Sequence, residues 1–196
     1  MANSKEMYSL IADVGGTNAR MQLIKFAQDA KIPVTVASTF FKTEEFTSFR
    51  DIVKAFLKEF EGTDKYPNNA TLAIAGAIFD NKLRMANLPH WPEMDGDALG
   101  KEFNIWPFKF INDFEAIGYS LLKIPQENLV QLNTVKPVIG RPMAVIGSGT
   151  GLGECVLNPG IGPDGSVQYI VCPTEGGHKD FAPTDQTDFD YLQYNL

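Results

Sequence analysis

Two glycine-rich turns hold the residues of this sequence that are best suited to bind phosphate. The first runs Asp13-Val-Gly-Gly-Thr-Asn18 and the second Gly147-Ser-Gly-Thr-Gly-Leu-Gly153, each between two apolar stretches. Glycine lets phosphate oxygens approach backbone N–H groups closely, and Thr17 and Thr150 add hydroxyl donors. A single turn of this kind is usually only a turn, but the repeat of strand, Gly-Thr turn and strand favours phosphate binding.

Neither turn carries one of the common nucleotide-binding fingerprints. Leu152 stands where a G-x-G-x-x-G motif needs its last glycine, and no stretch fits G-x-x-x-x-G-K-[ST]. The sequence therefore argues against a nucleotide-dependent dehydrogenase and against a P-loop enzyme.

Two aspartates stand where apolar strands are expected to end. Asp13 either forms the turn or anchors Mg²⁺, through water, and the pattern alone does not decide between the two. Asp113 follows an apolar strand and opens a helix, where it or Asn112 is a natural cap. A helix N-terminus also keeps a carboxylate ionised, which suits a general base, although the pattern alone favours capping.

Glu175-Gly-Gly-His178 places a carboxylate and an imidazole on a flexible stretch of backbone. The two cysteines lack the spacing of metal ligands and the second histidine is far away in the sequence, so we expect no zinc site there. His90 is interpreted as structural, and Cys155 and Cys172 as thiols of the core.

The elements that must position these residues alternate between strands and helices. The clearest helix spans 48–62, with apolar residues at three- and four-residue intervals, Ser48 as N-cap and Gly62 as the stop. The continuous apolar run 70–79 predicts a strand covered on both faces, and 88–104 allows only a weak helix. Further strands are expected at 8–12, 19–23, 34–40, 82–86, 108–112, 143–147, 154–157 and 167–172, and further helices at 113–123 and 189–196. An α/β fold follows.

Composition excludes several classes of protein. A chain of 196 residues allows one large domain or slightly more. Seventeen basic and 24 acidic residues give a net charge of −7 without a basic run, so we expect no nucleic-acid partner. No apolar run reaches the roughly 18–20 residues that span a bilayer, and the first residues lack a signal-peptide core. We therefore expect a cytoplasmic protein without membrane association.

Five motifs in a fixed order resemble those of the bacterial-type glucokinase family, within the hexokinase and actin-like ATPase superfamily. They are Asp13-Val-Gly-Gly-Thr-Asn-Ala-Arg20, Asn87-Leu-Pro-His-Trp91, Ile111-Asn-Asp-Phe114, Gly147-Ser-Gly-Thr-Gly-Leu-Gly153 and Glu175-Gly-Gly-His-Lys-Asp-Phe-Ala-Pro183. Each motif alone is weak, but five in order over residues 8–183 are specific. The resemblance implies an actin-like ATPase (ribonuclease H-like) two-domain sugar kinase.

The same resemblance implies a reaction and its residues. The reaction moves the γ-phosphoryl group of ATP to the 6-hydroxyl of glucose, the first step of glycolysis, with Mg²⁺. Asp113 becomes the general base on that hydroxyl, a role that can coexist with capping. The implied sugar-binding residues are Asn87, Asn112, Asp113, Glu175 and His178. The implied phosphate-binding residues are Gly15, Gly16, Thr17 and Asn18 in the first turn and Gly149, Thr150 and Gly151 in the second, with Asp13 serving Mg²⁺ through water.

The resemblance also implies that the chain stops early, because members of the family are longer. We expect residues 1–111 to form a small N-terminal α/β domain with the first phosphate loop. We expect 112–196 to be the start of an incomplete large domain, with the catalytic aspartate, the second loop and the sugar-binding loop. The alternative is a non-catalytic sugar-binding or regulatory fragment of the family, and a homodimer stays open.

Overall fold

The computed structural model describes residues 6–26, 33–149 and 151–195. The chain divides into two compact units, residues 1–117 and 118–196. The domain division between residues 111 and 112 stays a prediction. None of the helices within the described residues is both long enough and apolar enough to cross a membrane.

The first unit is built on a five-stranded mixed sheet. Its strands, from edge to edge, are β3 (Val34–Lys42), β2 (Asn18–Phe26), β1 (Met7–Val14), β4 (Asn69–Ile74) and β7 (Phe108–Asn112). β2 lies antiparallel to both β1 and β3, whereas β4 runs parallel to β1 and to β7. The carboxyl ends of β1, β4 and β7 therefore meet at one edge of the sheet.

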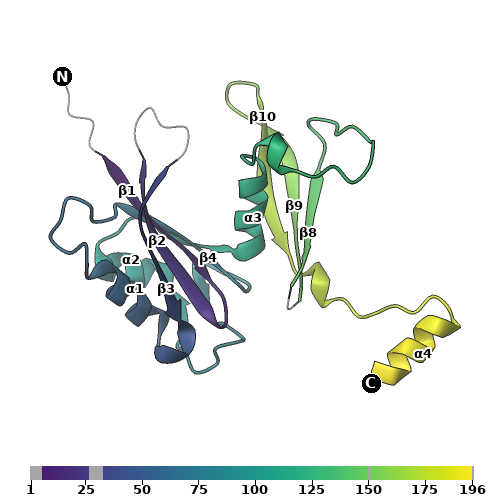
Figure 1. The fold of residues 1–196 in the computed structure, drawn as a ribbon, viewed down its shortest axis with the longest axis horizontal. Helices are drawn as coiled ribbons and strands as arrows, with labels where there is room; N and C mark the ends of the chain where they lie inside the picture. The colour runs from purple at the N-terminus through teal and green to yellow at the C-terminus, as the bar shows by residue number, and fades with distance from the viewer. Residues whose placement is uncertain (1–5, 27–32, 150, 196) are drawn as a thin grey trace. The chain divides into compact units, whose positions relative to one another are not determined.

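One face of this sheet carries the core of the first unit. α1 (Phe49–Leu57) and α2 (Gly96–Phe103) lie on the same side of the sheet (Figure 1). The buried side chains of both helices join those of the strands in a single apolar cluster. Ser48 caps α1 as predicted, since its hydroxyl accepts from the N–H of Asp51. The regular helix ends at Leu57, however, and the residues up to Gly62 form turns.

The prediction of one strand over 70–79 is wrong. β4 ends at Ile74, because the chain leaves the sheet at Ala75 and Gly76, where Gly76 adopts a φ of +137°. Burial alternates along β4, with Ala70 and Leu72 buried and Thr71 exposed, so only one face is covered. The apolar run comprises a strand and a following loop, in which Ile78 packs against the core while Phe79 is 76% exposed.

The segment between β4 and β7 contains more structure than its sequence predicts. The strand expected at 82–86 is the shorter β5 (Lys82–Leu83), and it pairs with β6 (Met94–Asp95), a strand that no pattern indicated. The weak helix expected after Met94 is α2, which begins after Asp95 because that carboxylate accepts from the N–H of Ala98.

Asn81 fastens this segment to the edge of the first sheet. Its side-chain amide donates to the carbonyl of Phe108 at 2.8 Å and accepts from the N–H of Phe110 at 2.9 Å. It also donates to Asp97 at 2.7 Å. Asn81 thus takes the place of a neighbouring strand along the outer edge of β7, and its φ of +60° is one that asparagine tolerates.

Replacing Asn81 with alanine should therefore destabilise the first unit by about 3 kcal/mol, since backbone groups of Phe108 and Phe110 lose their partner. Asn104 is the matched control, because it also has a positive φ of 54° but no side-chain hydrogen bond among the described residues. Asn104→Ala should cost only about 1 kcal/mol. Urea unfolding followed by the fluorescence of Trp91 and Trp106 measures both, and equal losses would contradict the role of the amide.

The second unit repeats the antiparallel half of the first sheet. β8 (Met143–Ser148), β9 (Leu152–Ile161) and β10 (Val167–Thr174) lie in the order β10-β9-β8, as β3, β2 and β1 do in the first sheet. Both β1–β2 and β8–β9 are hairpins joined by a Gly-Thr turn, so the predicted repeat is confirmed.

The remaining elements come from both units. They are the helices α3 (Asp113–Leu121) and α4 (Gln186–Asn195) and three short 3₁₀ helices, of which η1 (Thr43–Glu45) lies in the first unit and η2 (Gln126–Asn128) and η3 (Gly176–His178) in the second.

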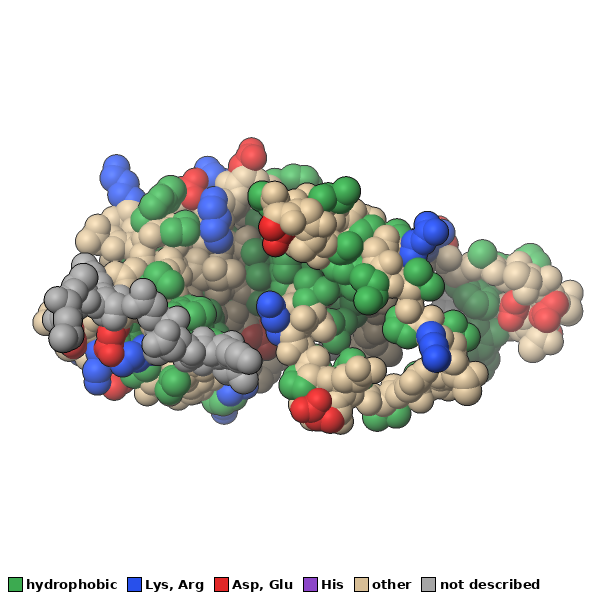
Figure 2. All heavy atoms as spheres, turned by 90° about the horizontal axis from the view of Figure 1, so that it is seen from above, with side chains coloured by type: hydrophobic (Ala, Val, Ile, Leu, Met, Phe, Trp, Pro, Cys, Tyr) green, Lys and Arg blue, Asp and Glu red, His purple; other side chains and the backbone are tan. Residues whose placement is uncertain are grey.

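Apolar surface is covered less completely in the second unit than in the first. Among the described residues of the second unit, the buried apolar side chains are Cys155, Leu157 and Val171. α3 packs against two of them, since a side chain at Gly118 would meet Val171 and Cys155. By contrast, Ile146 and Ile170 are 67% and 61% exposed. Green apolar side chains are visible at the surface in Figure 2. This sheet leaves much apolar area open to solvent.

Candidate functional site

The first Gly-Thr turn joins β1 to β2 at the edge where β1 ends. It is closed by a hydrogen bond from the N–H of Gly15 to the carbonyl of Asn18, 2.9 Å long. Asp13 lies in β1 opposite Arg20 of β2, with its side chain exposed. Within the described part of the chain, no donor is paired with the carboxylate of Asp13. That carboxylate is therefore available to a hydrated cation.

Asn87 lies directly against this turn. A Cβ atom at Gly16 would come within 2.9 Å of the Cβ atom of Asn87, so only glycine fits there without a shift. Asn87 itself is exposed. The structure thus brings together a residue predicted to bind sugar and a residue predicted to bind phosphate, 71 positions apart in the sequence.

Asn112 ends β7 and caps α3. Its side-chain oxygen accepts from the N–H groups of Phe114 at 2.9 Å and Glu115 at 3.3 Å. Its amide nitrogen donates to the carbonyl of Gly76 at 3.2 Å, just beyond the end of β4. The sequence left open whether Asn112 or Asp113 caps α3. Asn112 is the main cap, because it accepts from two N–H groups of the helix and Asp113 from one.

Asp113 is the first residue of α3 and is half-buried. Its Oδ1 accepts from the N–H of Phe114 at 2.9 Å, and no donor among the described residues is paired with Oδ2. One carboxylate oxygen is therefore held while the other is available to a hydroxyl group. Two residues on, partial burial raises the pKa of Glu115, so the first turn of α3 is partly desolvated.

The strand register sets the spacing between Asp13 and Asp113. Asp13 pairs with Ala73 of β4, and Ala73 pairs with Ile111 of β7. Two strand spacings separate Asp13 from Ile111, which is about 10 Å. Asp113 follows two residues later, so both carboxylates belong to the same edge of the sheet, where ligands bind in open α/β sheets.

The second glycine-rich segment also contains a backbone hydrogen bond. The N–H of Gly149 donates to the carbonyl of Gly151 at 2.8 Å, between β8 and β9. Gly149 and Gly151 are exposed, and Thr150 lies outside the described residues. The prediction for Thr150 therefore stays a prediction.

The segment predicted to bind sugar in the second unit packs against the start of β9. Oε2 of Glu175 lies 3.2 Å from Nδ1 of His178, and both side chains are exposed. A Cβ atom at Gly177 would overlap the backbone carbonyl of Leu152, and one at Gly176 would overlap the carboxylate of Glu154. The two glycines between Glu175 and His178 thus let η3 lie directly on the end of the second turn.

Two residues that no sequence motif indicated, Glu154 and Thr43, also contact the site segments. Glu154 accepts from the hydroxyl of Thr174 at 3.3 Å and lies beside Gly176. Thr43 donates hydrogen bonds to the carbonyl groups of Gly16 and Thr17 in the first turn, although it lies 26 residues after Thr17 in the sequence. Thr43 lies three residues beyond the strand expected at 34–40, and a threonine at such a position is too common to indicate a role.

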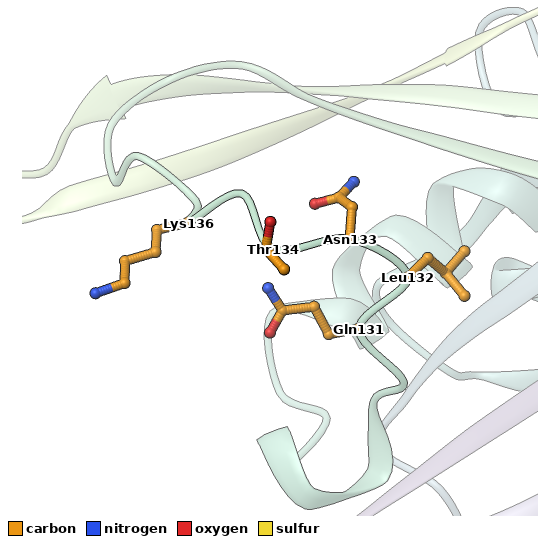
Figure 3. Close-up of a pocket in the computed structure, with 5 residues that line it drawn as sticks. All are labelled: Gln131, Leu132, Asn133, Thr134 and Lys136. Atoms are coloured by element: carbon orange, nitrogen blue, oxygen red, sulfur yellow. The ribbon is translucent and has the colours of Figure 1, made fainter.

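A hollow of about 530 Å³ lies in the loop between η2 and β8. It is lined by Gln131, Leu132, Asn133, Thr134 and Lys136, all from one stretch of chain (Figure 3). None of the predicted phosphate- or sugar-binding residues lines it, so we assign it no part of the site.

No three histidine, cysteine, aspartate or glutamate side chains gather into a metal-binding group among the residues that the structure describes. Mg²⁺ commonly uses one or two carboxylates together with water and phosphate oxygens, and the single exposed carboxylate of Asp13 fits that mode.

Comparison with known proteins gives one consistent result. The sequence model of the Glucokinase family matches residues 10–195. Glucokinase of Nostoc sp. is 32% identical over 187 residues, which are 95% of this chain and 52% of that protein. Glucokinase of Chromohalobacter salexigens is 36% identical over 187 residues, with 95% and 54% covered. The chain thus spans about half the length of these curated relatives.

Solved structures agree with the sequence relatives. A glucokinase from an Antarctic psychrotroph superposes with a TM-score of 0.73 at 28% identity, over 95% of this chain and 55% of that one. Glucokinase from Balamuthia mandrillaris, solved in complex with glucose, gives a TM-score of 0.64 at 23% identity, over 100% and 55%. The predicted α/β fold of the actin-like ATPase sugar kinases is confirmed, and the chain belongs to the glucokinase family.

Proposed function

We propose that the protein containing this chain is an ATP-dependent glucokinase, which transfers the γ-phosphoryl group of ATP to the 6-hydroxyl of glucose. The observation that carries this proposal is the carboxylate of Asp113. One of its oxygens is held by the N–H of Phe114, while the other is available to accept the proton of a sugar hydroxyl. Membership of the family supports this role, because its curated members are named glucokinases.

Glucose offers several hydroxyl groups, so its site needs polar side chains that donate and accept hydrogen bonds. In our proposal Asn87, Asn112, Glu175 and His178 make these bonds. The glucose complex of the Balamuthia mandrillaris relative supports glucose as the sugar. The oxygen of Asn112 caps α3 and one N–H of its amide donates to Gly76, so its contribution to the sugar comes from the second N–H of the amide.

For ATP, we propose that the two Gly-Thr turns bind phosphate oxygens, with Gly15, Gly16, Thr17 and Asn18 in the first turn and Gly149, Thr150 and Gly151 in the second. The N–H groups of Gly15 and Gly149 close the turns, so the phosphates bind the other backbone N–H groups. Asp13 would hold Mg²⁺ through water. When bound, Mg²⁺ neutralises charge on the phosphates during transfer. We place the reaction in the cytoplasm, as the first step of glycolysis, and a homodimer stays a prediction.

The test is phosphorylation of glucose by the intact protein, measured as formation of glucose 6-phosphate from glucose and Mg-ATP. Calorimetry of the 196-residue chain with glucose and with Mg-ATP accompanies it. Turnover by the intact protein supports the proposal. Sugar binding without turnover in the intact protein would overturn it in favour of a sugar-binding or regulatory module.

A further inference from the structure

The side chain of Thr43 is buried against the first Gly-Thr turn. It is 1% exposed, and its hydroxyl donates to the carbonyl of Gly16 at 2.6 Å. Its backbone N–H donates to the carbonyl of Thr17 at 3.0 Å. Thr43 directly follows β3 and begins η1. It therefore donates hydrogen bonds to two consecutive carbonyl groups of the turn.

These two bonds fix the directions of two peptide planes. In a planar trans peptide the carbonyl and the N–H point in opposite directions. Because the carbonyls of Gly16 and Thr17 turn towards Thr43, the N–H groups of Thr17 and Asn18 turn away from it. Successive N–H groups on one side of a turn form a concave surface that binds anions. Within the described residues, no acceptor is paired with the N–H of Thr17.

We propose that Thr43 is a positioning residue for phosphate binding, which holds the first turn with its N–H groups open to the phosphates of ATP. The proposal rests on the function proposed above and adds a residue that touches neither substrate. The turn is held from a second side as well, since Gly16 lies against Asn87. Thr43 and Asn87 thus leave Gly16 little freedom to rotate its peptide.

The burial of the hydroxyl makes the contribution of Thr43 measurable. Valine has nearly the shape of threonine but cannot donate to Gly16, whereas serine keeps the donor and loses only a methyl group. The backbone bond to Thr17 survives in both variants. Thr43→Val therefore removes one hydrogen bond to the turn, and Thr43→Ser is its matched control.

In the intact protein, Thr43→Val should raise the KM for Mg-ATP about tenfold and leave the KM for glucose within about twofold, because one hydrogen bond is worth about that factor. Thr43→Ser should restore the wild-type KM for Mg-ATP. Calorimetry should give the same order for Mg-ATP affinity. If valine does not allow folding, which circular dichroism and thermal unfolding show, Thr43→Ala provides the same comparison with serine.

The outcomes separate this inference from the proposed function. A wild-type protein that phosphorylates glucose, together with a folded Thr43→Val variant of unchanged KM for Mg-ATP, overturns the role of Thr43. A lower melting temperature with unchanged nucleotide affinity overturns it too, since Thr43 then acts on stability alone. If Thr43→Val weakens the binding of Mg-ATP but the wild-type protein does not phosphorylate glucose, the proposed kinase activity is overturned and the positioning role of Thr43 is supported. Absence of Mg-ATP binding overturns both.

Discussion

Asp113→Asn lowers the rate of glucose phosphorylation by the intact protein about 10²–10⁴-fold and leaves glucose binding measurable, as expected when a general base is lost. Asparagine keeps the side-chain oxygen that accepts from the N–H of Phe114 at 2.9 Å, so the helix start is preserved. The amide nitrogen that replaces the second oxygen cannot accept the proton of the sugar hydroxyl. Steady-state kinetics give kcat, and calorimetry gives the glucose affinity.

This substitution also decides between the two readings of Asp113, because capping alone predicts a variant of nearly wild-type activity. The structure has already assigned most of the cap to Asn112, which accepts from two N–H groups of α3. Glu115→Gln is the control, since it removes a negative charge from the same helical turn without touching Asp113. A rate loss of similar size in Glu115→Gln would show that the negative charge at the start of α3, and not a general base at Asp113, accounts for the effect. Full activity of Asp113→Asn would remove Asp113 as the base.

Most of the elements around these residues could be predicted because their signals are local. The hairpin 8–26, the cap at Ser48 and the strand before Asp113 follow from alternation, spacing and capping over a few residues. The failures occurred where a distant contact decides the structure. β6 exists because it pairs with β5, and the end of β4 is set at Gly76 by the course of the chain rather than by hydrophobicity.

The candidate site divides in the same way. Motifs named the residues at the ends of β1 and β7, because a turn and a helix start leave traces in adjacent positions. They could not indicate Thr43 or Asn81, since the side chain of each donates to a backbone carbonyl 27 positions away. Nor could they show that Asn112 rather than Asp113 carries most of the cap, since either residue type serves.

The glycine pair between Glu175 and His178 provides the second large effect. A Cβ atom at Gly177 would overlap the carbonyl oxygen of Leu152, a backbone atom at the end of the second turn. Backbone cannot rotate out of the way as a side chain can, so Gly177→Ala must displace η3, the start of β9, or both. We expect a loss of about 10²-fold in kcat/KM of the intact protein, the order that a misplacement of 1 Å causes. Overpacking should also cost ~1–3 kcal/mol of stability.

Two other glycines provide control substitutions, for which we expect smaller effects than for Gly177. At Gly176 the atom in the way is the carboxylate of Glu154, the end of a flexible side chain, so Gly176→Ala should have a smaller effect. At Gly160 of β9 the nearest atom is 3.8 Å away, and Gly160→Ala should behave like the wild type. Hydrogen exchange of residues 147–153 and 174–179 locates the change. Gly177→Ala must accelerate exchange in both segments if η3 and the second turn support each other. Wild-type kinetics in this variant would contradict the prediction, because the loop would then accommodate a side chain without moving the residues proposed to bind sugar.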